Sequence, residues 1–380
     1  MCRSQLSRFL VVFMCLFAWN TTLADDRWQG RTYPADASGV ENADAFFLTQ
    51  TGGGGGAFGR GDIHGQLCDV DFATLQVGFA CGTGGVFETE DCGLTWHRIK
   101  PNGNWQRIQA VSPDDVWLLE GIHPGGFGKV WLWHSVDGGK SWNEVEALKG
   151  KLAAYGGKGL YCRWDQRWVL GGDFTTYRSA DGGKIWQAVN FQGFLYGVYD
   201  MAVPADLPRG QSRQGFDVYV LGHKDGPASW LVRSSDGGQT WREVPLPAAA
   251  RPQLAGGRVF FSTCRDGWVG GKSGKCILTR DGGETWRDCS VPTDQRVVAL
   301  WLDQLGRGFA AVDNTDWLHL RQTVYMTSDY GASWAPVLGG YKQILSFCDL
   351  GRNHLWAVGY EPGLVQQDIV GILKPDQWKP

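Results

Sequence analysis

Four carboxylates in this chain could supply the acid and the base of a glycoside hydrolase. Glu120, Asp173, Asp313 and Glu361 each occur where an apolar stretch gives way to a polar loop. Most glycoside hydrolases hold two carboxyl groups across the scissile bond, one as an acid and the other as a base or nucleophile. The separation of these four groups in the fold decides whether any two could act together, so glycan hydrolysis is kept as an alternative.

Other reaction chemistries find little support in the sequence. The seven histidines are scattered without HxH or HExxH spacing, which argues against a zinc site. No Gly-x-Ser-x-Gly motif indicates a serine nucleophile. The formal net charge is −3 with both signs mixed, which gives no reason to expect a nucleic acid partner. We therefore expect no metal and no cofactor.

Short loops that follow the second strand of each predicted unit carry the candidate binding residues. An aromatic side chain near an arginine is typical of the residues that dominate protein interfaces. The alternative is that these are ordinary solvated loop residues. The candidates are His123, Asp173, His223, Lys224, Asp225, Asp313, Asp316, Trp317, His319, Arg321 and Glu361.

Six copies of an eight-residue signature organise the elements that carry these loops. They end at Trp96, Trp142, Trp186, Trp241, Trp286 and Trp334, with spacings of 46, 44, 55, 45 and 48 residues. Each copy has an aspartate in third place, a glycine in fifth place and the tryptophan last, which predicts a tight hairpin. The aspartate can accept hydrogen bonds from its own turn, and the tryptophan supplies a large apolar surface. We expect the signature aspartates to be structural; they are Asp91, Asp137, Asp181, Asp236, Asp281 and Asp329.

A period in the mid-forties predicts small sheets repeated around a ring. A seventh unit, residues 344–369, keeps two apolar strands but lacks the signature. Closing the ring would leave no sheet edge exposed. We therefore expect an all-β, seven-bladed β-propeller over residues 64–380, with signature hairpins in six blades.

The N-terminal residues predict export. Arg3 and Arg8 precede an apolar run from Phe9 to Trp19, so residues 1–24 are expected to be a signal peptide. Residues 25–63 form a segment with a glycine-rich loop, Gly52 to Gly56. The strand that closes the ring is expected from this segment, around Trp28 or Phe46–Phe47, or from the tail near Trp378. The location expected from these features is the periplasm.

Removal of residues 1–24 leaves eight of the ten cysteines, and export permits disulfides. Cys276 and Cys289 are symmetric about the centre of one signature hairpin, so we predict a bridge between them. Cys68 and Cys81 are candidates for a second bridge around the turn near Leu75. Cys162 and Cys348 are expected to be free buried thiols.

The signature resembles the Asp box, also called the bacterial neuraminidase repeat. Asp-box families include sialidases and other glycoside hydrolases, sortilin-type receptors, and the photosystem II stability/assembly factor family. Units ending GFACG, WVLGG, GWVGG and LWAVG make the chain most similar to the last of these, from about Gln66 to Ile369. That resemblance implies a non-catalytic assembly factor, in the periplasm or, in a photosynthetic host, in the thylakoid lumen.

The chain lacks the arginine motif that a sialidase would need. Sialidases clamp a carboxylate with three arginines, the first in an Arg-Ile-Pro-like motif before the first box. Here only Arg31 and Arg60 precede the first signature, and neither matches that motif. We therefore predict a non-enzymatic scaffold that binds a protein of an envelope or membrane complex. A glycosidase or a carbohydrate-binding propeller is the alternative.

Overall fold

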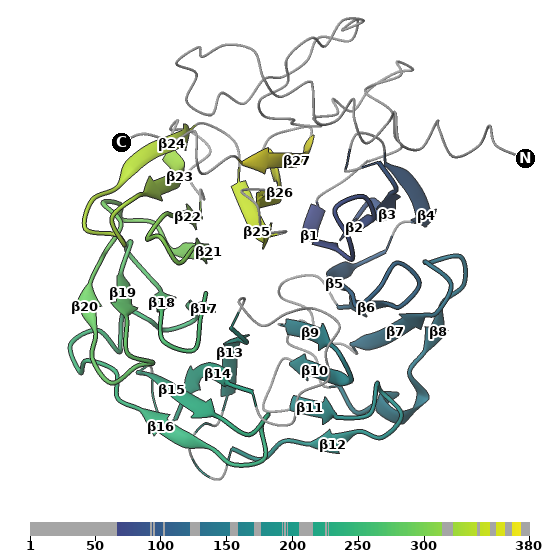
Figure 1. The fold of residues 1–380 in the computed structure, drawn as a ribbon, viewed down its shortest axis with the longest axis horizontal. Coiled ribbons are helices and arrows are strands. Elements are labelled where there is room, and N and C mark those ends of the chain that lie inside the picture. Colours follow the sequence, from purple (N-terminus) through teal and green to yellow (C-terminus); the bar gives the residue numbers. More distant parts are fainter. Residues whose placement is uncertain are drawn as a thin grey trace, which may run out of the picture.

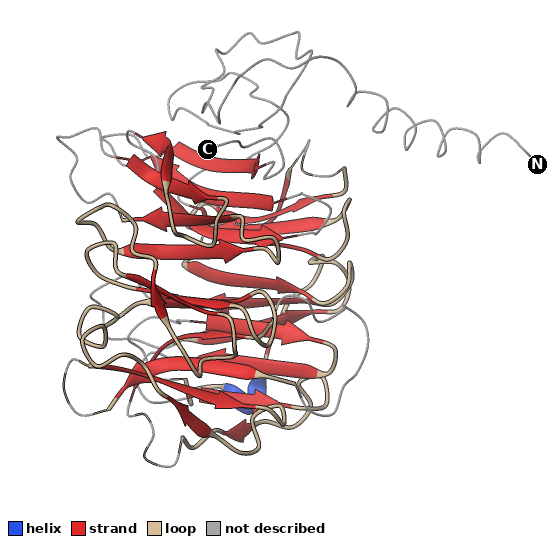
Figure 2. Cartoon of the chain, turned by 60° about the vertical axis from the view of Figure 1, so that its left-hand side comes forward, coloured by secondary structure: helices blue, strands red, loops and turns tan. Residues whose placement is uncertain are grey.

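The computed structural model describes residues 67–373, except 92, 94–95, 102, 122–129, 153–158, 171–175, 192, 194, 196, 205–215, 225, 227, 314–321, 340–342, 350–354 and 362–366. Antiparallel sheets stand side by side around a ring, so the fold is an all-β propeller (Figure 1). Among the described residues, the short 3-10 helix η1 (Glu146–Leu148) is the single helical element (Figure 2). No helix in this part of the chain is long and apolar enough to cross a bilayer.

The first three blades each contain four strands in chain order from the centre of the ring outward. Blade 1 has β1 (Leu67–Phe72), β2 (Gly78–Gly82), β3 (Gly85–Thr89) and β4 (His97–Lys100). Blade 2 has β5 (Trp105–Ala110), β6 (Val116–Glu120), β7 (Trp131–Ser135) and β8 (Asn143–Glu144). Blade 3 has β9 (Gly159–Arg163), β10 (Gln166–Leu170), β11 (Thr176–Ser179) and β12 (Gln187–Ala188).

The next three blades repeat this arrangement. Blade 4 has β13 (Gly197–Ala202), β14 (Val218–His223), β15 (Ser229–Ser234) and β16 (Arg242–Val244). Blade 5 has β17 (Arg258–Phe261), β18 (Gly267–Gly270), β19 (Cys276–Thr279) and β20 (Arg287–Asp288). Blade 6 has β21 (Val297–Leu302), β22 (Gly308–Val312), β23 (Gln322–Thr327) and β24 (Ala335–Gly339).

The expectation of seven blades is wrong, because the described residues form six complete four-stranded blades. The last sheet has three strands, β25 (Gln343–Asp349), β26 (Leu355–Glu361) and β27 (Gln367–Leu373). In every complete blade, a signature hairpin returns the chain from the third strand to the fourth. The last unit has lost that signature, so no such hairpin follows β27 among the described residues. Both predicted sources of a closing strand lie outside the described residues.

The hydrophobic core lies between neighbouring sheets rather than within one layer. Each cluster of buried side chains joins one sheet to the next around the ring. The last sheet joins the first blade in the same way, since Cys348 and Val358 pack with Val70 and Phe72. Burial of apolar surface at these contacts, at about 25 cal/mol per Å², is the main force that holds the ring together.

Side chains from one blade satisfy the inner strand edges of the next. Asp69 and Asp71 in β1 accept the backbone N–H groups of Ile108 (3.1 Å) and Ala110 (2.9 Å) in β5. Asp200 in β13 likewise accepts the N–H group of Val259 in β17 at 3.0 Å. Strand edges that face the centre would otherwise leave polar backbone groups unpaired. The inner edge is therefore stabilised by contacts between blades.

The signature aspartates hold their own hairpins. In the hairpin of blade 5, Asp281 accepts the backbone N–H of Thr285 at 2.9 Å and the hydroxyl of Thr279 at 2.8 Å. The Thr279 hydroxyl oxygen also accepts the N–H of Gly283 at 2.8 Å. The closing Trp286 donates its indole N–H to the carbonyl of Gly283 at 3.1 Å. The same Ser or Thr to Asp contact recurs in the other five hairpins.

Acid should destabilise the hairpins at a pH well below the usual range for aspartate. Hydrogen bonds from Thr285 and from Ser141 lower the pKa of Asp281 and Asp137, respectively, to about 2. Both pKa values lie below the unfolded value of about 3.9, so this stabilisation is complete above about pH 4 and is lost as pH falls toward 2. Tryptophan fluorescence during acid titration should report this loss. A variant with Asp281→Asn should show a smaller dependence between pH 4 and 2, and an unchanged acid transition would contradict the assignment.

The fifth-place glycines of the signatures in blades 2 to 6 also pack closely against the preceding blade. A Cβ atom on Gly183 would lie 2.4 Å from Cη2 of Trp117, in blade 2. The same construction on Gly238 would lie 2.2 Å from Cη2 of Trp168, in blade 3. Both glycines have positive φ, +93° and +89°. These glycines are therefore required by the turn and by the close approach of two blades.

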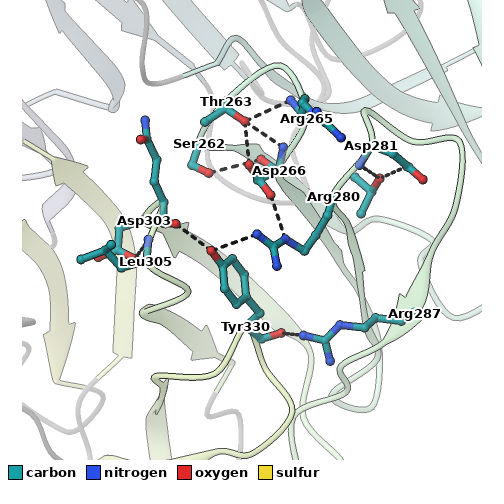
Figure 3. A network of polar contacts seen from close by, with 12 residues as sticks. Ser262, Thr263, Arg265, Asp266, Arg280, Asp281, Arg287, Asp303, Leu305 and Tyr330 are labelled. Carbon is teal, nitrogen blue, oxygen red and sulfur yellow. Dashed lines mark hydrogen bonds and ion pairs between the residues drawn. The ribbon is translucent and has the colours of Figure 1, made fainter.

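Blade 6 departs from the signature by placing Tyr330 where four other copies have glycine. Tyr330 has a φ of +60°, a left-handed conformation that bulky side chains rarely adopt. Its ring lies 4.1 Å from the Arg280 guanidinium, and its hydroxyl donates to the Gln304 carbonyl at 2.6 Å (Figure 3). Arg280 also pairs with Asp266 at 3.2 Å, while Arg287 donates to the Tyr330 carbonyl. This network joins blades 5 and 6 at the hairpin end.

Candidate functional site

The second strands end, and the loops named by the sequence begin, at the end of each blade opposite the signature hairpins. In blade 4, His223 ends β14 opposite Ser229, which begins β15, and also pairs with Gly197, which begins β13. The hairpin of the same blade begins at Ser234, at the other end of β15. We call the end with His223 the loop face. The starts of inner strands and the ends of second strands meet there, so both can contribute side chains.

An aromatic ring contacted by two cations marks the loop face of blade 4. The Lys224 ammonium and the Arg251 guanidinium lie 3.6 and 4.0 Å from the centre of the Trp230 ring. Glu243 joins the two cations, at 3.0 Å from Lys224 and 3.8 Å from Arg251. Cation–π contacts of partly desolvated groups each contribute on the order of 1 kcal/mol. The four side chains thus form an ordered, half-buried surface.

A second aromatic group connects this surface to blade 6. The rings of Tyr199 and His223 stack with centres 5.4 Å apart. Burial raises the pKa of Tyr199, and the positive charge of the exposed Arg296 opposes that shift. Arg296 directly precedes β21, and its carbonyl accepts the Asp313 N–H at 2.7 Å. Tyr199, His223 and Arg296 therefore continue the loop face from blade 4 toward blade 6.

The inner strands add two further arginines around one carboxylate. Burial lowers the pKa of the Arg258 guanidinium, Asp200 opposes this, and the positive charges of Arg107 and Arg296 lower the pKa further. Burial also raises the pKa of Asp200, while Arg258 and Arg107 pull it down. Arg258 donates through Nε to the Val298 carbonyl at 2.9 Å. Carboxyl groups with raised pKa values cluster at functional sites, which makes Asp200 a candidate.

The structure brings some of the sequence candidates together. His223 and Lys224 belong to the blade 4 surface, and Asp313 lies next to Arg296 in the backbone. Glu361 ends β26 in the last sheet. Glu120 ends β6 in blade 2, where its carboxylate accepts the Trp133 indole N–H at 2.8 Å. The candidates outside the described residues are His123, Asp173, Asp225, Asp316, Trp317, His319 and Arg321.

Sequence reasoning missed most of the residues that build this site. Tyr199, Asp200 and Arg258 lie on inner strands, and Trp230 is the second residue of β15, the third strand of blade 4. A usable signal was present, because Arg258 and Asp200 are charged residues within otherwise apolar strand segments. Charges at such positions are costly unless they are paired, so they point to a channel or a site.

The structure also places the described cysteines and the side chains that could bind a metal ion. Cys81, Cys162, Cys264, Cys276 and Cys289 are free thiols in this structure, and of the seven described cysteines all except Cys264 are buried. An irregularity in the β1–β2 register places Asp69, rather than Cys68, opposite Cys81. The bridges predicted for Cys276–Cys289 and Cys68–Cys81 remain predictions. Within the described ranges, no group of three or more His, Cys, Asp or Glu residues is placed to hold a metal ion.

Known structures share the fold at low sequence identity. YCF48 bound to a D1 peptide superposes with a TM-score of 0.57 and 15% identity, over 86% of this chain and 94% of that one. YCF48 from Cyanidioschyzon merolae gives 0.58 and 15%, over 82% and 96%. The GH74 xyloglucanase from Xanthomonas campestris gives 0.60 and 16%, over 83% of this chain and 53% of the enzyme. These likenesses establish the propeller fold.

Comparison of sequences adds a partial match. No protein-family profile matches the chain. The probable oligoxyloglucan-reducing end-specific xyloglucanase of Neosartorya fischeri is 28% identical over 167 residues. The match covers 42% of this chain and spans 19% of that protein's length.

Proposed function

We propose that this protein is a non-enzymatic propeller that binds another protein through the loop face of blades 4 to 6. The observation that carries the proposal is the grouping of Tyr199, Trp230, Arg251, Arg258 and Arg296 on one face. Trp, Tyr and Arg are the residue types enriched in interface hot spots. Partly buried rings and paired cations are already ordered, so binding costs little side-chain entropy.

The finer part of the proposal concerns the partner and the location. The YCF48 structure contains a D1 peptide, which supports a segment of a membrane or envelope protein as the partner here. The N-terminal sequence supports export to the periplasm, or to a lumen in a photosynthetic host. We also assign the six signature hairpins as Asp boxes, on the pattern of contacts that each aspartate makes within its own turn.

Charge reversal at an exposed arginine tests this proposal. Arg296→Glu should weaken capture of the partner by tenfold or more, because it places a negative charge near Tyr199 and Arg258. Lys184→Glu, the same charge change in an exposed hairpin at the opposite end, should leave capture unchanged. The measurement is crosslinking in the native envelope followed by identification of the captured protein. Equal capture by both variants, or no specific protein, would count against the proposal.

Glycoside hydrolysis is a second candidate function because of the Asp200 carboxyl group. Asp200 is partly exposed, has a raised pKa and lies near Arg107 and Arg258, which is an environment suited to a general acid. The partial likeness to a xyloglucanase suggests xyloglucan oligosaccharides as the substrates to try. Release of new reducing ends that disappears in Asp200→Asn would support a glycosidase. The asparagine oxygen can still accept the Val259 N–H, so this variant should keep the fold.

A further inference from the structure

Cys276 and Cys289 face each other across the two outer strands of blade 5. Cys276 begins β19, and Cys289 directly follows the two-residue strand β20. The Cys289 N–H donates to the Cys276 carbonyl at 2.9 Å, which continues the register of Ile277 with Asp288. The Cys289 side chain lies close enough to the Cys276 thiol to raise its pKa. Directly opposed residues of antiparallel strands have Cα separations of about 5.5 Å, within the range of disulfides.

The pair lies where blade 6 contacts blade 5. The side chains of Cys276 and Cys289 are 0% and 3% exposed. Trp334, which closes the blade 6 hairpin, donates its indole N–H to the Cys289 carbonyl at 2.9 Å. In the blade 5 hairpin, by contrast, Trp286 donates to a carbonyl of its own hairpin. Gly331 packs so closely that a Cβ atom there would lie 2.8 Å from the Cβ of Cys289.

We propose that Cys276 and Cys289 form a disulfide while blade 5 folds, and that docking of the blade 6 hairpin then seals it from solvent. The bridge closes the short outer strand β20 onto β19, to which the strand ladder joins it by two residue pairs. It also fixes the carbonyl to which Trp334 binds. The cysteine pair is therefore a covalent support for the junction between blades 5 and 6.

The chemistry needs an oxidant of the disulfide class, such as glutathione disulfide or an oxidising protein disulfide. One cysteine thiolate attacks a sulfur of the oxidant, and one oxidant thiolate leaves. The second cysteine thiolate then attacks the mixed disulfide, forms the Cys276–Cys289 bond and releases the other oxidant thiolate. Two protons are lost from the protein thiols and taken up by the two released thiolates. The protein loses two electrons and the oxidant gains them.

The folded, reduced protein should resist the same reaction. Burial raises the pKa of the Cys276 thiol well above its usual range, and the nearby Cys289 adds to the shift. Because the thiolate is the reactive species, both burial and the scarcity of thiolate slow the exchange. Cys264 is exposed, so it serves as an internal control for thiol reactivity.

Oxidative refolding of the full chain tests the proposal. Protein refolded from denaturant with reduced and oxidised glutathione should give Cys276 and Cys289 in one cross-linked tryptic pair, because Arg280 and Arg287 lie between them. Native reduced protein given the same oxidant should react at Cys264 but not at this pair. The oxidised form should melt higher than the reduced form by roughly 5 °C, as expected for a loop of about 15 residues in a protein of this size.

Two variants separate this outcome from general effects of thiol oxidation. Cys276→Ser should abolish the cross-linked pair and lower the oxidant-dependent rise in melting temperature by roughly 5 °C. Cys264→Ser should retain both. Recovery of both thiols in alkylated form after oxidative refolding of the unsubstituted chain would overturn the proposal, whatever the stability of the variants.

Discussion

Replacing Gly183 by alanine should destabilise the protein far more than the same substitution at its neighbour Gly182. A Cβ atom at position 183 would lie 2.4 and 3.0 Å from two carbons of the buried Trp117 ring in the preceding blade. Overpacking of a filled core costs about 1–3 kcal/mol, and a left-handed backbone adds about 1–2 kcal/mol for alanine. We expect a combined loss of about 2–5 kcal/mol, measured by urea or thermal unfolding.

Gly182 is the matched control in the same turn. It also has a positive φ, +75°, but a Cβ atom there would meet nothing within 4 Å. Gly182→Ala should therefore cost only the backbone part, about 1–2 kcal/mol. Equal losses at the two positions would show that turn conformation alone explains the glycines. A much larger loss at Gly183 would show that the hairpin also shapes the contact between blades 2 and 3.

Removal of the Asp115 carboxylate is expected to be the second large effect. Asp115 pairs with Arg167 at 3.0 Å, and the Arg167 side chain is 3% exposed. Asp115 also accepts the Trp117 indole N–H at 2.6 Å and contacts His134 Nε2 at 2.8 Å. Asp115→Ala leaves a buried guanidinium without its carboxylate, so we expect a loss of about 3 kcal/mol, at the lower end for buried pairs because Asp115 is partly exposed.

An exposed ion pair provides the control for this second prediction. Arg242 and Glu284 pair at 3.3 Å with side chains 50% and 60% exposed, so Glu284→Ala should change stability by less than about 0.5 kcal/mol. Burial alone would raise the pKa of Asp115, but the His134 hydrogen bond and the Arg167 charge outweigh it and the pKa is lowered. The stabilisation by Asp115 is therefore present above about pH 4 and is lost at lower pH. Similar losses of stability in Asp115→Ala and Glu284→Ala would contradict a larger contribution from the buried Asp115–Arg167 pair.

The repeat architecture was predictable because its signals are local. Gly, Asp and Trp at fixed places define each hairpin, and six copies at a regular spacing predict a propeller. The number of complete blades was not predictable in this way. The unit at residues 344–369 has the apolar pattern of a blade, but a fourth strand depends on chain that no signature places.

The site was only partly predictable, because it depends on contacts between blades. His223 and Lys224 were found as polar loop residues that follow a strand. Arg258 and Asp200 come together across two inner strands that are 58 positions apart in the chain, and nothing local signals their proximity. The contact of Gly183 with Trp117 was missed for the same reason, since the turn alone already explains a glycine.

Hydrogen bonds between the two ends of the ring determine when blade 1 can finish folding during synthesis. Asp69 and Asp71 are among the first described residues to be made, yet they accept hydrogen bonds from Ser346 (2.6 Å) and Cys348 (3.4 Å), each 277 positions later. Until the ribosome has released that distant strand, the two carboxylates cannot reach their native environment. Blade 1 is therefore expected to stay incompletely folded throughout translation. Chains truncated before residue 343 should be cleaved by proteases faster than the full-length chain.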